Sequence, residues 1–215
     1  MEYKLSTLSS VQVSEVPEDV QEYIRIHFDA MYAYRPEGKC KVLVGKDKRE
    51  QVSERGHKSY GKTPKLNPEN PKSFMFSGRD EHGNQDEIPA VFRPILDFMN
   101  KDAAIPYNQI VVNYYEDGAE FIPMHSDCRA GMVPGAPIAV VNMDNSDQAD
   151  GYRPRTFLMS TRSETKDVKI KTFGLPLWNG TVIKMQGKVQ EEFRHGVAKD
   201  ETKYKRISVT LRSFL

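Results

Sequence analysis

The stretch Gln109-Ile-Val-Val-Asn-Tyr-Tyr115 is apolar and rich in β-branched and aromatic residues, which is typical of a buried strand. Similar short segments follow it, with no helical pattern between them. They cover Ile138 to Met143, Thr156 to Ser160, Val168 to Phe173, Thr181 to Met185 and Ile207 to Leu211, and turn residues such as Asn179-Gly180 punctuate the series. This pattern predicts a mainly β (α+β) fold in which two sheets pack as a jelly roll, or double-stranded β-helix.

Helical patterns are confined to the first half of the chain, where they predict flanking N-terminal helices. Apolar residues recur at helical spacing from Pro17 to about Tyr34, and again from about Ile88 to Asn100. A short strand is expected over Cys40 to Val44. Residues 45–71 are polar and contain several glycines and prolines, so we interpret them as a long loop. Residues 78–86 are interpreted as a charged turn.

The charge of the chain is balanced overall and uneven locally. Lys and Arg number 31 against 30 Asp and Glu, so no overall positive charge indicates nucleic-acid binding. From Lys39 to Lys72, however, ten basic residues stand against four acidic ones. This excess either meets a phosphate backbone or belongs to a solvated loop.

Cysteine content and hydropathy exclude several protein classes. The two cysteines, Cys40 and Cys128, are too few for a disulfide framework or a cysteine-rich zinc site. The N-terminus has no apolar signal-peptide core, and no run approaches the roughly 20 apolar residues that span a bilayer. We therefore expect a protein of the cytoplasm or nucleus that has no membrane partner.

His125 and Asp127 are the strongest candidates for a metal site. In extended backbone, residues two apart point the same way, so both side chains can reach one ion. His195, far downstream, supplies a second imidazole. Two imidazoles and one carboxylate form the set that binds non-haem Fe(II) and leaves positions open for O₂ and a chelating co-substrate. Zinc hydrolases also use two histidines and an acid, so the ligands alone do not decide the metal.

Two downstream arginines favour iron with a dicarboxylate co-substrate. In Arg206-Ile-Ser-Val-Thr-Leu-Arg212 the even spacing puts both arginines on one face of a strand, opposite Ile207, Val209 and Leu211. Two inward guanidiniums beside a metal require anions. A dicarboxylate that chelates iron at one end and pairs with Arg at the other meets this requirement. The alternative is an exposed basic edge strand.

Together these motifs resemble the AlkB family of Fe(II)/2-oxoglutarate dioxygenases. The resemblance covers roughly residues 74 to 215 and rests on Asn113-Tyr-Tyr115, His125-Ser-Asp127, His195, and Arg206 with Arg212 six residues later. It implies iron binding by His125, Asp127 and His195, and pairing of Arg206 with the distal carboxylate of 2-oxoglutarate. It further implies that the co-substrate site is completed by Asn113, Tyr115, Ser208 and Arg212.

The resemblance also implies a set of substrate contacts. Phe74, Phe76 and Ser77 resemble the aromatic hairpin that stacks the damaged base in DNA-repair members. Arg129 stands where the best-known repair members carry an acid that recognises the methylated base. We expect residues 1–105 to supply the helices, the basic loop and a substrate-recognition lid, and residues 106–215 to form the oxygenase core of one structural unit.

The expected activity is oxidative demethylation of N-alkylated bases in DNA or RNA by a monomer, with Fe(II), 2-oxoglutarate and O₂. The products would be formaldehyde, succinate and CO₂. One alternative is a 2-oxoglutarate-dependent hydroxylase of a protein side chain or small molecule, which Arg129 and the balanced charge favour. The other is a non-catalytic binding module, which an intact set of ligands and arginines disfavours.

Overall fold

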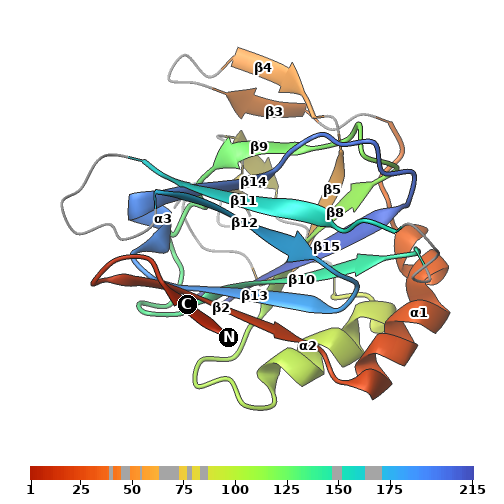
Figure 1. Ribbon diagram of the computed structural model, residues 1–215, viewed down its shortest axis with the longest axis horizontal. Helices are drawn as coiled ribbons and strands as arrows, with labels where there is room; N and C mark the ends of the chain where they lie inside the picture. The colour runs from red at the N-terminus through yellow and green to blue at the C-terminus, as the bar shows by residue number, and fades with distance from the viewer. Residues whose placement is uncertain are drawn as a thin grey trace.

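The computed structural model describes residues 1–38, 41–44, 49–53, 55–62, 73–76, 79–82, 87–146, 152–162 and 171–215, with the backbone alone for 41–44, 49–51, 73–76 and 79–82. Two antiparallel sheets lie face to face (Figure 1). The larger follows the order β1 (Glu2–Lys4), β2 (Ser9–Glu15), β13 (Thr181–Gly187), β10 (Ile138–Asp144), β15 (Arg206–Arg212), β8 (Gln109–Tyr115), β5 (Gly56–Gly61). The smaller follows β12 (Thr172–Leu177), β11 (Arg155–Thr161), β14 (Phe193–Val197), β9 (Ile122–His125). The expected mainly β jelly roll is confirmed.

Helices cover the outer face of the larger sheet (Figure 1). They are α1 (Glu18–Tyr32), the 3-10 turn η1 (Ala90–Phe92) and α2 (Arg93–Asn100), while the short α3 (Val189–Glu192) joins β13 to β14. Apolar residues of α1 and α2, such as Ile24 and Ile95, are fully buried in one cluster with residues of β8, β10 and β15. Burial of this apolar face stabilises both helices more than their intrinsic propensity does. The two expected N-terminal helices are therefore confirmed.

The space between the sheets holds a second core and the polar residues of the site. Ile138, Phe157 and Phe193 are among the apolar residues of this second cluster. In β15, Ile207, Val209 and Leu211 pack in the helix-covered cluster. Because side chains alternate along a strand, Arg206, Ser208 and Arg212 face the space between the sheets. The predicted separation of the two arginines from the apolar residues of this strand is confirmed.

Segments before residue 105 also enter the larger sheet. β2 pairs with β13 from Ser9 to Glu15, and β5 pairs with β8 from Gly56 to Gly61. Two further hairpins precede α2, namely β3 (Lys41–Val44) with β4 (Arg49–Val52), and β6 (Ser73–Phe76) with β7 (Arg79–His82). The division of the chain at residue 105 stays a prediction.

The interpretation of residues 45–71 as a loop was wrong where β4 and β5 lie, and the charged turn over 78–86 was wrong at β7. β5 reads His57-Lys-Ser-Tyr60 and lies at the edge of the larger sheet. Its polar His57 and Ser59 are buried, at 7% and 6% exposure. These polar side chains lie inside the protein, so polarity did not signal solvent exposure here.

The strand expected over Val168 to Phe173 is displaced. β12 spans Thr172–Leu177 and so shares only its first two residues with the prediction, while residues 163–170 lie outside the described part of the chain. Pro176 concealed this strand, because proline is excluded from central strands and tolerated at edges. β12 is an edge strand of the smaller sheet. Cys40, expected to open β3, is also outside the described residues.

In the described ranges, no helix combines the length and the apolar composition that crossing a bilayer requires.

Candidate functional site

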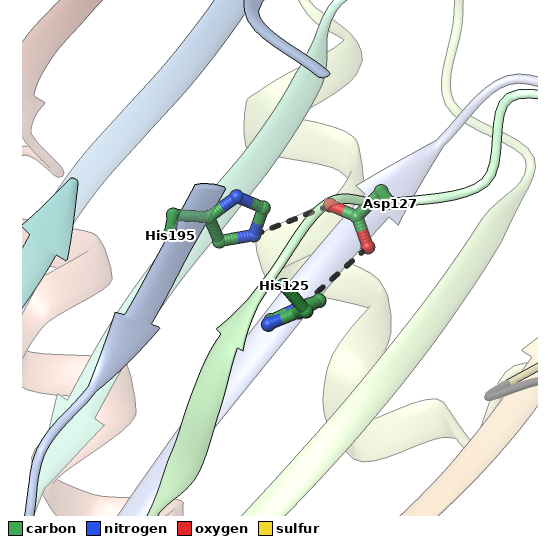
Figure 2. A group of neighbouring side chains, drawn as sticks. All are labelled: His125, Asp127 and His195. Atoms are coloured by element: carbon green, nitrogen blue, oxygen red, sulfur yellow. Dashed lines mark ion pairs between the residues drawn. The ribbon is translucent and has the colours of Figure 1, made fainter. Parts of the chain in front are cut away.

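The three side chains singled out as metal ligands lie together between the sheets. His125 ends β9, His195 lies in β14, and the two residues are direct cross-strand partners. Asp127 follows β9 by two residues and turns back toward both imidazoles (Figure 2). One ligand atom from each residue lies within 4.8 Å of the other two. Two imidazole nitrogens and a carboxylate at this spacing fit an Fe(II) ion.

Arg212 contacts this triad through Asp127. Its Nη2 donates to Asp127 Oδ1 at 2.5 Å, and both side chains are 7% exposed. His195 Nε2 lies 3.4 Å from Asp127 Oδ2, and His125 Nε2 lies 4.0 Å from Oδ1. Although burial acts to raise the pKa of Asp127, Arg212 and the two imidazoles hold it well below its usual range. The carboxylate is therefore ionised, as a metal ligand must be.

The imidazole of His125 is oriented for metal binding. Its Nδ1 lies 2.9 Å from the carbonyl oxygen of Pro123. In the neutral tautomer that donates this hydrogen bond, Nε2 keeps its lone pair on the side of the triad. Burial and the neighbouring His195 lower the pKa of His125 to about 4, so the ring is neutral at physiological pH.

His195 is held by packing. It is 5% exposed, and the ring of Phe157 stacks on it with centroids 5.4 Å apart. Its ring centroid lies 4.4 Å from that of His125. The two imidazoles are thus fixed by the pairing of β9 with β14 and by an aromatic wall.

Arg206 is buried at the other end of β15, with one donor unused. Its Nε donates to Asn142 Oδ1, and its guanidinium lies 4.5 Å above the ring of Tyr115. Its Nη1 has no hydrogen-bond partner among the described residues, although the residue is only 3% exposed. A small cavity adjoins it, lined also by Asp144, Tyr152, Arg153, Arg155, Leu177, Thr202 and Tyr204. A buried cation with a free donor suits an anionic ligand.

Asn113 lies between the two arginine positions and is oriented by a third arginine. Arg55 Nε donates to Asn113 Oδ1 at 2.8 Å, and Arg55 is 7% exposed. The amide nitrogen of Asn113 consequently faces Ser208, whose Oγ lies 3.5 Å away. Asn113, Ser208 and Tyr115, all expected at the co-substrate site, therefore lie on adjacent strands of the larger sheet.

The expected substrate contacts are only partly described. Phe74 and Phe76 lie in β6, and this strand pairs with β7 as the hairpin resemblance implies, but their side chains and Ser77 lie outside the described part. Arg129 donates to the carbonyl oxygens of Gly187 at 2.8 Å and Ala136 at 3.2 Å. Its guanidinium ties the loop after Asp127 to the end of β13.

Four buried polar residues at the site had no role in the sequence interpretation. Asn142 holds Arg206, and as a polar residue in the apolar strand β10 it carried a usable signal. The guanidinium of Arg155 lies against the ring of Tyr115 and donates a hydrogen bond to the carbonyl oxygen of Ala198. Arg55 fell in the supposed loop. Gln190, which bonds the backbone of Asp127, has no local signal because its contact is long-range.

Comparisons with known proteins agree with this fold. The structure of OsALKBH1 matches with a TM-score of 0.54 and 16% identity, covering 94% of this chain and 97% of that chain. A 2OG-Fe(II) oxygenase family oxidoreductase from Burkholderia pseudomallei gives a TM-score of 0.53 and 14% identity, covering 94% and 84%. At these identities the likeness concerns the fold. Among curated proteins, no sequence matches this chain.

A family model also matches the sequence directly. The model described as the 2OG-Fe(II) oxygenase superfamily covers residues 49–212, which is more than half of the chain and includes every strand that carries a candidate ligand. The enzymes of this superfamily use Fe(II), 2-oxoglutarate and O₂, and His125, Asp127 and His195 form a possible iron-binding triad. The chain belongs to the 2OG-Fe(II) oxygenase superfamily.

Proposed function

We propose that this oxygenase oxidatively demethylates N-alkylated bases in DNA or RNA, releasing formaldehyde, succinate and CO₂. The observation that carries the chemistry is the convergence of His125, Asp127 and His195, with Arg212 at 2.5 Å from the carboxylate. The choice of substrate is supported by the AlkB-like motifs of residues 74–215, by the β6–β7 hairpin and by the likeness in fold to OsALKBH1.

The metal ligands in this proposal are His125, Asp127 and His195. Bound there, Fe(II) with 2-oxoglutarate and O₂ supplies the oxidant for the C–H bond of the methyl group. The His125 Nδ1–H bond to Pro123 holds its Nε2 toward the metal. Arg212 pairs with one carboxylate oxygen of Asp127 and fixes the plane of this carboxylate. The ligand set is thereby preorganised for the metal.

The 2-oxoglutarate site in this proposal runs along β15. Arg206 binds the distal carboxylate with the Nη1 that the described residues leave without a partner. The amide nitrogen of Asn113 and the hydroxyl of Ser208 donate along the length of the co-substrate, Tyr115 packs against Arg206, and Arg212 lies near the chelating end. These groups are buried, which strengthens their electrostatic interaction with a dianion.

Substrate binding is assigned to Phe74, Phe76 and Ser77, with stacking of an unpaired or flipped base on the aromatic rings. Arg129 is assigned a supporting role, because its guanidinium already donates to two backbone carbonyls. We further propose that the enzyme acts as a monomer in the cytoplasm or nucleus. Size-exclusion chromatography with light scattering tests the first point, and microscopy of the tagged chain tests the second.

The deciding experiment incubates the protein with Fe(II), 2-oxoglutarate, ascorbate and a panel of oligonucleotides that carry single methylated bases. We expect succinate that depends on iron and co-substrate, and formaldehyde equal to the amount of base restored, as measured by mass spectrometry. Iron-dependent succinate without formaldehyde from any oligonucleotide would favour the hydroxylase of a protein side chain or small molecule. Absence of succinate under every condition would leave only a binding module.

A further inference from the structure

Gln190 holds the backbone of the loop that carries Asp127. Its Oε1 accepts a hydrogen bond from the Asp127 N–H at 2.8 Å, and the residue is 6% exposed. Its Nε2 lies 3.3 Å from Met185 Sδ, an acceptor, which orients the amide so that the oxygen faces the loop. Gln190 lies in α3, directly before the strand that carries His195.

Ser126, between the two ligands of the motif, makes a second bond to the same segment. Its Oγ donates to the carbonyl oxygen of Phe193 at 2.7 Å. The ladder between β9 and β14 is irregular here, since the register shifts between His195 and Val197. Asp127 lies beyond the end of β9, so the pairing of the two strands does not reach it. The two side-chain bonds fix the loop where the ladder does not.

The segment that receives these bonds is itself anchored. Glu192 Oε2 accepts hydrogen bonds from Ser6 and Ser9, each at 2.6 Å. Arg162 Nη1 donates to the carbonyl oxygen of Gln190 at 3.3 Å. Contacts from the residue after β11 and from the N-terminal segment, which precedes the family-matched residues 49–212, therefore fix α3.

We propose that Gln190 and Ser126 are positioning residues that hold the carboxylate of Asp127 at its distance from His195 and thereby set the affinity for the metal. The proposal rests on the assignment of the triad as the metal site. Without the bond to Gln190, the Asp127 N–H loses its acceptor and the loop gains freedom that metal binding must then remove. Residues that orient metal ligands typically change affinity by about 10- to 100-fold when they are removed.

The test measures the dissociation constant of Co(II), by anaerobic calorimetry and visible absorption, in the full-length metal-free chain. Gln190→Met keeps the length of the side chain and removes the acceptor, whereas Gln190→Glu retains an acceptor oxygen in either protonation state. Ser126→Ala removes the second bond with a minimal change in volume. Gln186→Met is the matched control, because Gln186 accepts from Ser10 Oγ at 3.3 Å in the neighbouring strand, away from the loop that carries Asp127.

We expect Gln190→Met and Ser126→Ala to weaken Co(II) binding about tenfold, with Gln190→Glu and Gln186→Met within threefold of the wild type. A constant within twofold of the wild type for both Gln190→Met and Ser126→Ala overturns the proposal. So does equal weakening in Gln190→Glu or Gln186→Met, which would indicate general loosening. If Gln190→Met does not fold, Ser126→Ala decides alone. Failure of the wild type to bind Co(II) would overturn the metal site itself.

Discussion

At the scale of single residues, the site contains buried charged side chains. Some of them have a partner of opposite charge, and Arg206 has none among the described residues. Asp127 and Arg212 form an ion pair in which both side chains are 7% exposed, so each compensates for the burial of the other. The Nε of Arg206 donates a hydrogen bond to the neutral amide of Asn142. Its Nη1 has no hydrogen-bond partner among the described residues. In the proposed function, the distal carboxylate of 2-oxoglutarate supplies an anionic partner for Arg206.

Replacing Arg206 by Ala should raise the KM for 2-oxoglutarate by about 10- to 100-fold, because a charge-assisted hydrogen bond contributes about 1.5–3 kcal/mol. Arg206→Lys keeps the positive charge but lacks the planar guanidinium, so its KM for 2-oxoglutarate should lie between those of the wild type and Arg206→Ala. Steady-state succinate release at varied 2-oxoglutarate measures both. A KM unchanged in Arg206→Ala would place the distal carboxylate elsewhere.

The substitution Asn113→Asp should weaken the binding of 2-oxoglutarate without lowering the stability of the fold. The new carboxylate keeps the acceptor for Arg55 and makes that contact an ion pair, so the melting temperature should stay or rise. It also removes the amide donor that faces Ser208 and adds a negative charge beside a dianion. We expect the KM for 2-oxoglutarate to rise about tenfold or more. A raised KM accompanied by a large loss of stability would instead indicate that Asn113 is structural.

Whether the sequence predicts a contact in the site depends on how far apart its two residues lie along the chain. The grouping of His125 with Asp127, and of Arg206 with Arg212, could be predicted from the sequence. Residues at even spacing on extended backbone point to the same side, and this rule needs only local sequence. The contacts of Gln190 with Asp127 and of Arg55 with Asn113 join residues 63 and 58 positions apart. No local pattern encodes such pairs, and the polarity of Arg55 and its neighbours suggested a loop.

At the scale of elements, the pairing of β9 with β14 brings the first two candidate ligands to the third. Neither strand was predicted, since β9 contains Pro123 and β14 contains Gly196, and both residues are disfavoured in strands. Gly196 is needed because a Cβ at this position would lie 2.7 Å from the carbonyl oxygen of Ile122. The same residue that obscured the strand in the sequence permits the close approach of the two backbones.

Gly196→Ala should therefore push β9 away from β14 and separate His125 from His195. We expect Co(II) affinity to fall at least tenfold, in addition to a loss of stability of about 1–3 kcal/mol from the overpacked contact. Gly174→Ala is the control: it lies in β12 of the same sheet, and its Cβ would meet Thr156 Cγ2 at 2.7 Å, away from the ligands. The control should keep its metal affinity, because the exposed Thr156 side chain can turn away from the new methyl group. Equal metal affinity in the two variants would show that the spacing of β9 and β14 does not matter.

At the scale of the whole molecule, the larger sheet separates two environments. Its inner face carries the charged site, and its outer face packs under α1 and α2 in an apolar cluster that includes Tyr107 and Tyr114. Binary patterning predicted the two helices, the series of strands and the two faces of β15, but not which face of the larger sheet the helices cover. The long-range order of the strands was not predictable from patterning, and the entry of β2 and β5 into the larger sheet depends on it.

The buried tyrosines of the outer layer should make the fold sensitive to alkali. Burial raises the pKa of Tyr107 to about 12, and burial together with Tyr60 raises that of Tyr114 further. Below pH 10 these phenols are protonated in both states, so the stability is fully present. Between pH 10 and 12 the unfolded chain ionises while folded Tyr107 stays protonated, so stability falls as the pH rises.

For Tyr107 alone the loss should reach about 2–3 kcal/mol by pH 12, since one pKa unit corresponds to roughly 1.4 kcal/mol. Urea unfolding followed by circular dichroism at pH 8, 10 and 11 measures it. Tyr107→Phe should remove the part of this dependence that Tyr107 contributes and leave the part that Tyr114 contributes. The same alkaline loss in Tyr107→Phe as in the wild type would mean that folding does not raise the pKa of Tyr107.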